Sequence, residues 1–153
     1  MTSSGISTFR PDRLREARER AGLSPEQLGV LAGVSPETAR RAEGARGHPN
    51  ARVARALAQA LGVELDHLAP PARDLTLGQA RQRTGRTQRE IARALGMSVQ
   101  MVSAVERGVY RARQPDRWAA AYRMSRKRWW QAWETGRQTR IRAMENTQRA
   151  GGA

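Results

Sequence analysis

Residues 87–108 read TQREIARALGMSVQMVSAVERG and carry the clearest signal for local structure in the chain. Its apolar residues recur at helical spacing on both sides of Gly96-Met97-Ser98. This pattern predicts two short helices joined by a tight turn. In that turn the glycine allows the chain to reverse, the methionine fills the core and the serine caps the second helix.

A second copy of this pattern lies earlier in the chain. Residues 14–22 and 77–85 share the motif L-x-x-A-R-x-R-x-G at an offset of 63 residues. At this offset residues 14–44 show 8 identities in 31, mainly at Gly, Ser, Glu and apolar positions. The chain therefore contains an internal repeat of one small fold.

Helical apolar spacing and the Ser, Pro and Gly signals predict five helices in each copy and no strand of any length. In the first copy we expect residues 11–20, a helix from Pro25 that ends at Gly33, a helix from Pro36, residues 50–61 and a short closing helix over 63–68. In the second copy we expect residues 77–84, 88–95, 99–107, 115–122 and a final helix from Ser125 to about Met144.

Two adjacent prolines, Pro70 and Pro71, separate the copies and predict a short, stiff linker. Because so short a linker limits independent motion, we expect the relative orientation of the copies to be largely fixed. The expected organisation is a first domain over residues 10–69, a second domain over residues 74–134, and a C-terminal helical extension with a frayed tail over residues 135–153.

Positive charge is concentrated in the second copy. The 153 residues contain 28 Lys and Arg against 14 Asp and Glu, a formal net charge of +14. Residues 1–70 account for +2 of this charge and residues 71–153 for +12. The second copy is therefore expected to face a polyanion.

Several classes of protein are disfavoured by composition. The chain has no cysteine, which excludes a disulfide scaffold, a zinc knuckle and a thiol nucleophile. His48 and His67 stand apart in the sequence, so we expect no metal site and no cofactor. The lack of a long apolar run predicts no membrane segment and a cytoplasmic, nucleoid-associated protein.

Residues 87–108 closely resemble the Cro/phage-repressor helix-turn-helix family (XRE-like), down to the closing Glu106-Arg107-Gly108. Residues 13–68 resemble the same family more loosely. The resemblance implies an all-α fold with two tandem five-helix repressor-like helix-turn-helix domains, a short Pro-rich linker and a C-terminal helical extension. It also implies that the third helix of each domain reads the major groove of double-stranded DNA.

The resemblance assigns DNA contacts in the second copy. The implied residues are Gln88, Ser98, Val99, Gln100, Ser103, Ala104, Arg107, Arg111 and Arg113. Gln100 is expected to bond adenine, Val99 to pack on a thymine methyl, and Gln88 to match the family's phosphate-contacting glutamine. The arginines after the third helix are expected to clamp phosphates, and the alternative is that they form a solvated face.

The first copy departs from the pattern. Its equivalent exposed positions begin at Pro36, and the DNA contacts they predict are Glu37, Arg40, Arg41 and the nearby Arg46. Pro25 replaces the phosphate-contacting glutamine and cannot make that contact. Two interpretations stay open: a weaker reader of DNA, or a domain that has drifted toward holding a partner protein.

Two structural ion pairs are implied by the same resemblance, because the family pairs an arginine of its first helix with the glutamate that closes its third. In this sequence the pairs are Arg18–Glu43 and Arg81–Glu106. Their expected role is to fix the first helix against the third.

Tryptophans crowd the second copy at positions 118, 129, 130 and 133. We expect a small core and a packing seam for the C-terminal helix, and the alternative is base stacking or a ligand pocket. Trp129 and Trp130 are adjacent and cannot share one helical face. One of them is therefore expected to cover the other copy or a second subunit, and a homodimer through Trp129, Trp130 and Trp133 is a possible assembly.

The sequence favours a sequence-specific transcriptional regulator that binds double-stranded DNA, and a repressor over an activator. The alternative of another class is a protein-interaction module, such as an antitoxin or a phage or plasmid factor in which the first domain binds a partner protein. A third hypothesis is non-specific coating of nucleic acid. An enzyme is not expected, because no nucleophile–base set or phosphate-cradling glycine loop is present.

Overall fold

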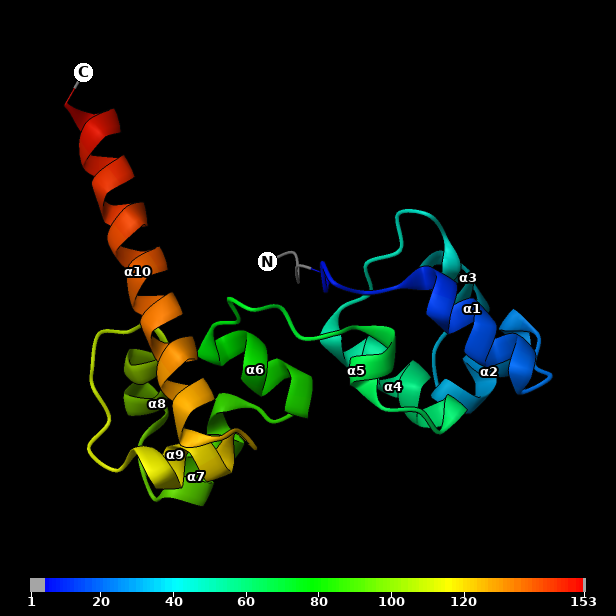
Figure 1. The fold of residues 1–153 in the computed structure, drawn as a ribbon, viewed down its shortest axis with the longest axis horizontal. Coiled ribbons are helices and arrows are strands. Elements are labelled where there is room, and N and C mark those ends of the chain that lie inside the picture. The colour runs from blue at the N-terminus through cyan, green and yellow to red at the C-terminus, as the bar shows by residue number, and fades with distance from the viewer. Residues whose placement is uncertain (1–4, 153) are drawn as a thin grey trace. The chain divides into compact units, whose positions relative to one another are not determined.

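The computed structural model describes residues 5–152, and within them it contains ten helices and no strand. The chain divides into two compact units between Ala72 and Arg73. The first unit contains α1 (Pro11–Arg20), α2 (Pro25–Ala32), α3 (Pro36–Glu43), α4 (Ala51–Leu61) and α5 (Leu65–Leu68). The second unit contains α6 (Leu77–Thr84), α7 (Gln88–Leu95), α8 (Val99–Glu106), α9 (Pro115–Ala121) and α10 (Arg126–Gly151). Figure 1 shows the helices of each unit.

Short polar signals set the helix boundaries, as the sequence predicts. Ser35 and Ser98 cap α3 and α8, each by accepting a hydrogen bond from a backbone N–H three residues on. Gly33 and Gly96 end α2 and α7 in the left-handed region, with φ of 69° and 66°. Only glycine adopts this conformation without strain, and each unit therefore turns sharply between its second and third helices.

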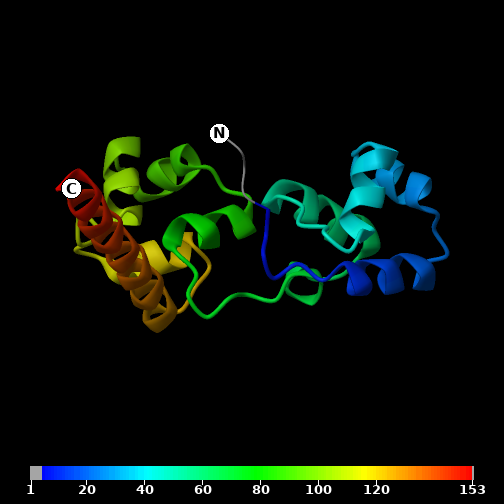
Figure 2. The ribbon, with the colours of Figure 1, turned by 90° about the horizontal axis from the view of Figure 1, so that it is seen from above.

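The core of the first unit lies between α1, α2, α4 and α5. Leu14, Leu28, Leu57 and Leu68 are fully buried there. The third helix meets α1 and α2 through small side chains, because its buried residues are alanines. Figure 2 shows α2 and α3 of this unit from above, in blue to cyan.

The core of the second unit is aromatic at its C-terminal side. Trp118 of α9 lies 5.9 Å from Trp129 and 6.4 Å from Tyr122 between ring centroids, and all three rings are buried. Burial of rings of this size contributes several kcal/mol to the stability of so small a core. Helix α10 also packs on α6 and α8, so α9 and the start of α10 are integral parts of this unit.

The C-terminal helix differs from the expectation. Residues 126–151 form one continuous helix, which extends past the expected end near Met144 and into the part of the chain where a frayed tail was expected. The physical reason is local: residues 137–150 contain no Pro or Gly that would end a helix, and Gly152 is the C-cap. Ala153, the last residue of the expected tail, lies outside the described residues.

The expectation that the tryptophans form a packing seam and a dimer surface is also corrected in part. Trp129 is 0% exposed in the core of its own unit, so it cannot contribute to a dimer surface as the sequence suggested. Trp130 and Trp133 are half-buried and pack edge-to-face on each other, with ring centroids 5.6 Å apart.

Candidate nucleic-acid interface

The exposed face of α8 is composed of the residues that the sequence assigns to DNA contact. Ser98, Val99 and Gln100 are exposed, while Ser103 and Ala104 are half-buried. The opposite face, with Val102 and Val105, is fully buried. The helix therefore lies on the surface of its unit with its first turn open to solvent.

A groove of about 730 Å³ lies where the N-terminal ends of α7 and α8 approach each other. Its lining residues are Arg81, Thr87, Gln88, Arg89, Val99 and Gln100. The Arg81 guanidinium is bonded within the unit, so the Arg89 guanidinium and two carboxamides share this concave surface with the apolar Val99. Such a surface offers hydrogen-bond donors to phosphates and both donors and acceptors to base edges.

Gln88, the first residue of α7, is held at the edge of this groove. Its side-chain Nε2 donates a hydrogen bond of 2.9 Å to Oε2 of Glu106, and the residue is half-buried. The contact joins the start of α7 to the end of α8. It therefore fixes the orientation of the two helices of the motif relative to each other.

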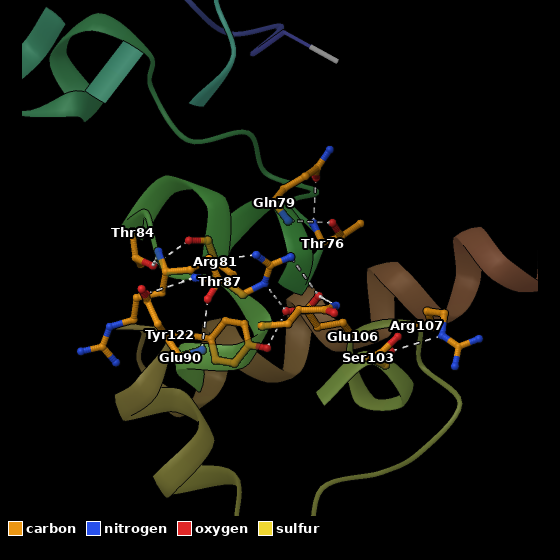
Figure 3. A network of polar contacts seen from close by, with 12 residues as sticks. Thr76, Gln79, Arg81, Thr84, Thr87, Glu90, Ser103, Glu106, Arg107 and Tyr122 are labelled. Carbon is orange, nitrogen blue, oxygen red and sulfur yellow. Dashed lines mark hydrogen bonds and ion pairs between the residues drawn. The ribbon is translucent and has the colours of Figure 1, made fainter. Parts of the chain in front are cut away.

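Glu106 is the centre of a buried polar network formed by Arg81, Gln88, Glu106 and Tyr122, which we call the Glu106 network. Arg81 Nε and the Tyr122 hydroxyl each donate to Glu106 Oε1, both over 2.7 Å. Figure 3 shows the side chains of Arg81 and Tyr122 converging on the carboxylate. Burial, and then the charge of Glu106, raise the pKa of the Tyr122 hydroxyl far above its usual range, so this group remains a donor.

The loop between α8 and α9, residues 107–114, displays three exposed arginines. Arg107 bonds the backbone oxygen of Ser103 over 3.3 Å, and Figure 3 shows its guanidinium pointing away from Glu106. The guanidinium of Arg111 lies over the ring of Trp130, with its central carbon 4.9 Å from the ring centroid. Arg113 is exposed as well. These charges lie immediately after the open helix α8, as a phosphate-contacting loop requires.

Helix α10 supports this loop. Trp133 Nε1 donates a hydrogen bond of 3.1 Å to the backbone oxygen of Tyr110. A Cβ built on Gly108 would lie 2.5 Å from the Cα of Arg137, so the loop and α10 meet backbone to backbone. The loop that bears the arginines is therefore anchored by residues far along the chain.

The equivalent surface of the first unit is electrostatically different. Arg40 forms an ion pair with Glu26, and Arg41 Nε lies 3.4 Å from Oε1 of Glu37. Pro36 and Glu37 are exposed at the start of α3, and Arg46 is exposed in the loop that follows. Glutamates of the same unit therefore offset the charges of both α3 arginines.

An exposed apolar patch lies on α2 of this unit. Val30 is 78% exposed and Leu31 is 60% exposed. The patch lies beside Glu26, which pairs with Arg40, so this surface of the first unit combines exposed apolar side chains with a neutralised arginine.

Both units contain the arginine–glutamate contact that the sequence pattern implies. Arg18 donates to both carboxylate oxygens of Glu43, and to the backbone oxygen of Leu23 over 2.7 Å. Arg81 similarly bonds Glu106, and the backbone oxygen of Arg86 over 3.1 Å. In each unit a largely buried ion pair ties the first helix to the end of the third.

Sequence reasoning missed two features of the second unit. The contact of Tyr122 with Glu106 spans 16 residues and follows no motif. The stacking of Arg111 on Trp130 depends on how α10 crosses the loop. A tyrosine that ends a helix directly before a tryptophan-rich helix is the only sequence signal, and it indicates core packing and not a polar contact.

Comparison with known protein families gives two matches in tandem. The family described as "Helix-turn-helix domain" matches residues 12–70, and the family described as "Helix-turn-helix" matches residues 77–116. No match was found among curated proteins or among solved structures.

One matched segment covers most of the first unit and the other covers the first half of the second unit, and together they define the class of the protein, a tandem helix-turn-helix protein. The segment over residues 77–116 is of the Cro/phage-repressor (XRE-like) type, as the resemblance of residues 87–108 predicted. Domains of this class are DNA-binding domains of regulators.

In residues 5–152 no helix combines the length and the apolar character needed to cross a membrane. Nor do three or more His, Asp or Glu side chains of these residues gather into a group suited to a metal ion.

Proposed function

We propose that this chain is a sequence-specific transcriptional repressor that binds double-stranded DNA and reads the major groove with α8. The observation that carries the proposal is the open first turn of α8, flanked by the groove at Gln88 and by the arginine loop. A helix of this size enters a major groove about 12 Å wide, with its leading side chains against the base edges.

The chemistry of the exposed residues defines the readout. Gln100 pairs with adenine N6 and N7, Val99 packs on a thymine methyl, and Ser103 donates to or accepts from either kind of base. Ser98 caps α8 through its side chain, so its role is to place the helix at the bases. Ala104 leaves room for the close approach of a base pair.

Phosphate contacts supply the affinity. Gln88 donates to a backbone phosphate on one side of α8, and Arg107, Arg111 and Arg113 contact phosphates on the other side. Repression needs no further chemistry, because a protein that occupies the duplex excludes others from the same site.

Two tandem domains extend the site. Because their third helices differ, we propose that one chain occupies two unlike half-sites and not a perfect palindrome. Glu37, Arg40, Arg41 and Arg46 would make the contacts of the first unit. A footprint that covers a single half-site would contradict this part of the proposal.

A second candidate function concerns the first unit: in this alternative the unit binds a partner protein and not DNA. The observation that favours it is the pairing of Arg40 with Glu26 and of Arg41 with Glu37, beside the exposed Val30 and Leu31. If this function is correct, Arg40→Ala leaves the selected DNA sequence unchanged. If the first unit reads DNA, the same variant relaxes base preference in one half of the site.

The experiment that tests the main proposal is selection of bound sequences from a random duplex pool, carried out on the full chain and on Gln100→Ala. We expect the unmodified chain to select a defined sequence. The variant should lose its base preference at one or two positions, a loss of about 1–3 kcal/mol of discrimination against the wrong base at each. Gln131→Ala, on the exposed side of α10, is the matched control and should select the original sequence.

Two results would contradict the proposal. One is identical base preference for Gln100→Ala and the unmodified chain. The other is binding that any competitor DNA abolishes at raised salt, because non-specific coating depends on charge alone.

A further inference from the structure

The Glu106 carboxylate is almost fully occupied by donors from three helices or their ends. Its Oε1 accepts from Arg81 Nε and from the Tyr122 hydroxyl, and its side chain is 7% exposed. Its Oε2 accepts from Gln88 Nε2 over 2.9 Å, with a longer contact of 3.4 Å from Arg81 Nη2. Because Tyr122 and Arg81 saturate Oε1, Oε2 remains as the acceptor for Gln88.

This arrangement determines which way the Gln88 carboxamide faces. A carboxylate only accepts hydrogen bonds, so the amide nitrogen of Gln88 must point inward, toward Glu106. One of the two hydrogens on that nitrogen is used in this bond. Among the described residues the other has no partner and is available at the groove lined by Thr87, Arg89 and Gln100.

The first unit provides an internal comparison. There Glu43 accepts from Arg18, with Arg15 Nε 3.7 Å away, and Pro25 occupies the position of Gln88. Within the described residues no tyrosine contacts Glu43. The tyrosine–carboxylate–carboxamide chain thus exists only in the unit that has a glutamine to orient.

Tyr122 also lies beyond the helix-turn-helix family match, which ends at residue 116. It is the C-cap residue that directly follows α9, and its ring packs on Trp118 and Trp129 of the aromatic core. Its hydroxyl is therefore held rigidly, because a ring of this size has little freedom in a close-packed core.

We propose that Tyr122 is a positioning residue for DNA binding, which acts through Glu106 to present the second N–H of Gln88 to a backbone phosphate of double-stranded DNA. This inference rests on the proposed function and assigns a role in it to a residue outside the matched motif. Tyr122 itself does not touch DNA.

The test is a double-mutant cycle on the full chain, with the tightest duplex from the random-pool selection as the probe. Tyr122→Phe removes only the hydroxyl and should weaken binding about fivefold, the effect of one hydrogen bond. Gln88→Ala should weaken binding about tenfold, and the double variant should be no weaker than Gln88→Ala alone. Tyr110→Phe is the matched control, because Tyr110 is exposed and its hydroxyl has no role in this chain of contacts.

A scan of duplexes with single methylphosphonate substitutions separates positioning from general stability. In the unmodified chain one neutralised phosphate should weaken binding through loss of the Gln88 contact. Tyr122→Phe and Gln88→Ala should both lose sensitivity at that same phosphate and keep it at all others. If Tyr122→Phe binds as the unmodified chain does, or binds less tightly but keeps the full penalty at that phosphate, the proposal is wrong.

Side-chain NMR of the unmodified protein tests the proposal even if Tyr122→Phe does not fold. On addition of the duplex, one of the two Gln88 Nε2 proton resonances should shift strongly and the other, bonded to Glu106, should shift little. Two unaffected resonances would overturn the inference while leaving DNA binding intact. Selection of no duplex at all would instead overturn the proposed function, and this inference with it.

Discussion

Gly136 on α10 lies against the backbone oxygen of Glu106, so that a Cβ built on the glycine would be 2.9 Å from that oxygen. The end of α8 is therefore in direct backbone contact with the C-terminal helix. A glycine inside a 26-residue helix lowers helix stability by about 1 kcal/mol relative to alanine. Its presence is explained by the close approach that it permits.

Gly136→Ala is expected to destabilise the second unit. The added methyl group gains helix propensity but cannot fit unless α10 moves away from α8, and such overpacking costs about 1–3 kcal/mol. We expect a net loss of about 1–2 kcal/mol in the free energy of unfolding, measured by chemical denaturation. Gly151→Ala, which adds the same group where nothing lies within 4 Å, should be neutral or stabilising. Equal effects of the two substitutions would contradict the packing described here.

The pKa of Tyr122 predicts how stability depends on alkaline pH. Because burial and Glu106 raise the pKa of the hydroxyl in the folded state, its contribution to stability is complete below the unfolded pKa of about 10 and is lost as pH rises above that value. We expect the free energy of unfolding to fall by about 1.4 kcal/mol per pH unit above pH 10 from this group. Tyr122→Phe should lack this component in denaturation curves measured from pH 8 to 11. An unchanged pH dependence in the variant would show that Tyr122 ionises in the folded protein.

The ion pairs of the first unit predict a gain of DNA affinity. Replacing Glu26 and Glu37 together by glutamine releases Arg40 and Arg41, while a glutamine at position 37 can still accept a hydrogen bond from a base. At low salt we expect the affinity for any duplex to rise about tenfold, with a salt dependence steeper by about 1 for each released arginine.

The control for this prediction is the pair Glu16→Gln and Glu19→Gln on α1, which changes the net charge equally and releases neither α3 arginine. If both double variants raise affinity to the same extent, net charge alone accounts for the effect. The ion pairs would then have no influence on DNA binding.

Arg111 is expected to contribute affinity without specificity. Its guanidinium is held over the ring of Trp130 in the loop that follows α8, and its interaction with a phosphate carries no sequence information. Arg111→Gln should weaken all duplexes about equally and reduce the slope of log affinity against log salt by about 1. Arg140→Gln on α10 removes the same charge and should have a smaller effect. Altered base preference in Arg111→Gln would place this residue at the bases.

Most of the fold is predictable from local signals. Pro, Ser and Thr at helix starts and Gly at helix ends act within four residues, so the sequence predicts the starts of α2, α3, α7 and α8 correctly. The packing of α10 is not predictable in this way. The close approach of Gly136 to the backbone oxygen of Glu106 joins residues 30 positions apart in the chain, which no local signal encodes.

The same distinction between local and long-range signals applies to the candidate site. Its exposed residues follow from the resemblance of residues 87–108, because side chains at fixed positions of a short helix face the same way in every copy. The partners of those residues do not follow from it. The pair Glu37–Arg41 is an i,i+4 contact within α3 and is local. That Glu26 neutralises Arg40, and that Tyr122 reaches Glu106, depends on tertiary packing.

The central claim is that the first turn of α8 faces the bases of a duplex. The most direct measurement is backbone NMR of the full chain titrated with its selected duplex. The account predicts that the largest amide shifts fall in residues 98–104 and at the start of α7, with smaller shifts in the loop of residues 107–113. Shifts confined to α10 or to the exposed face of α2, with α8 unchanged, would contradict it.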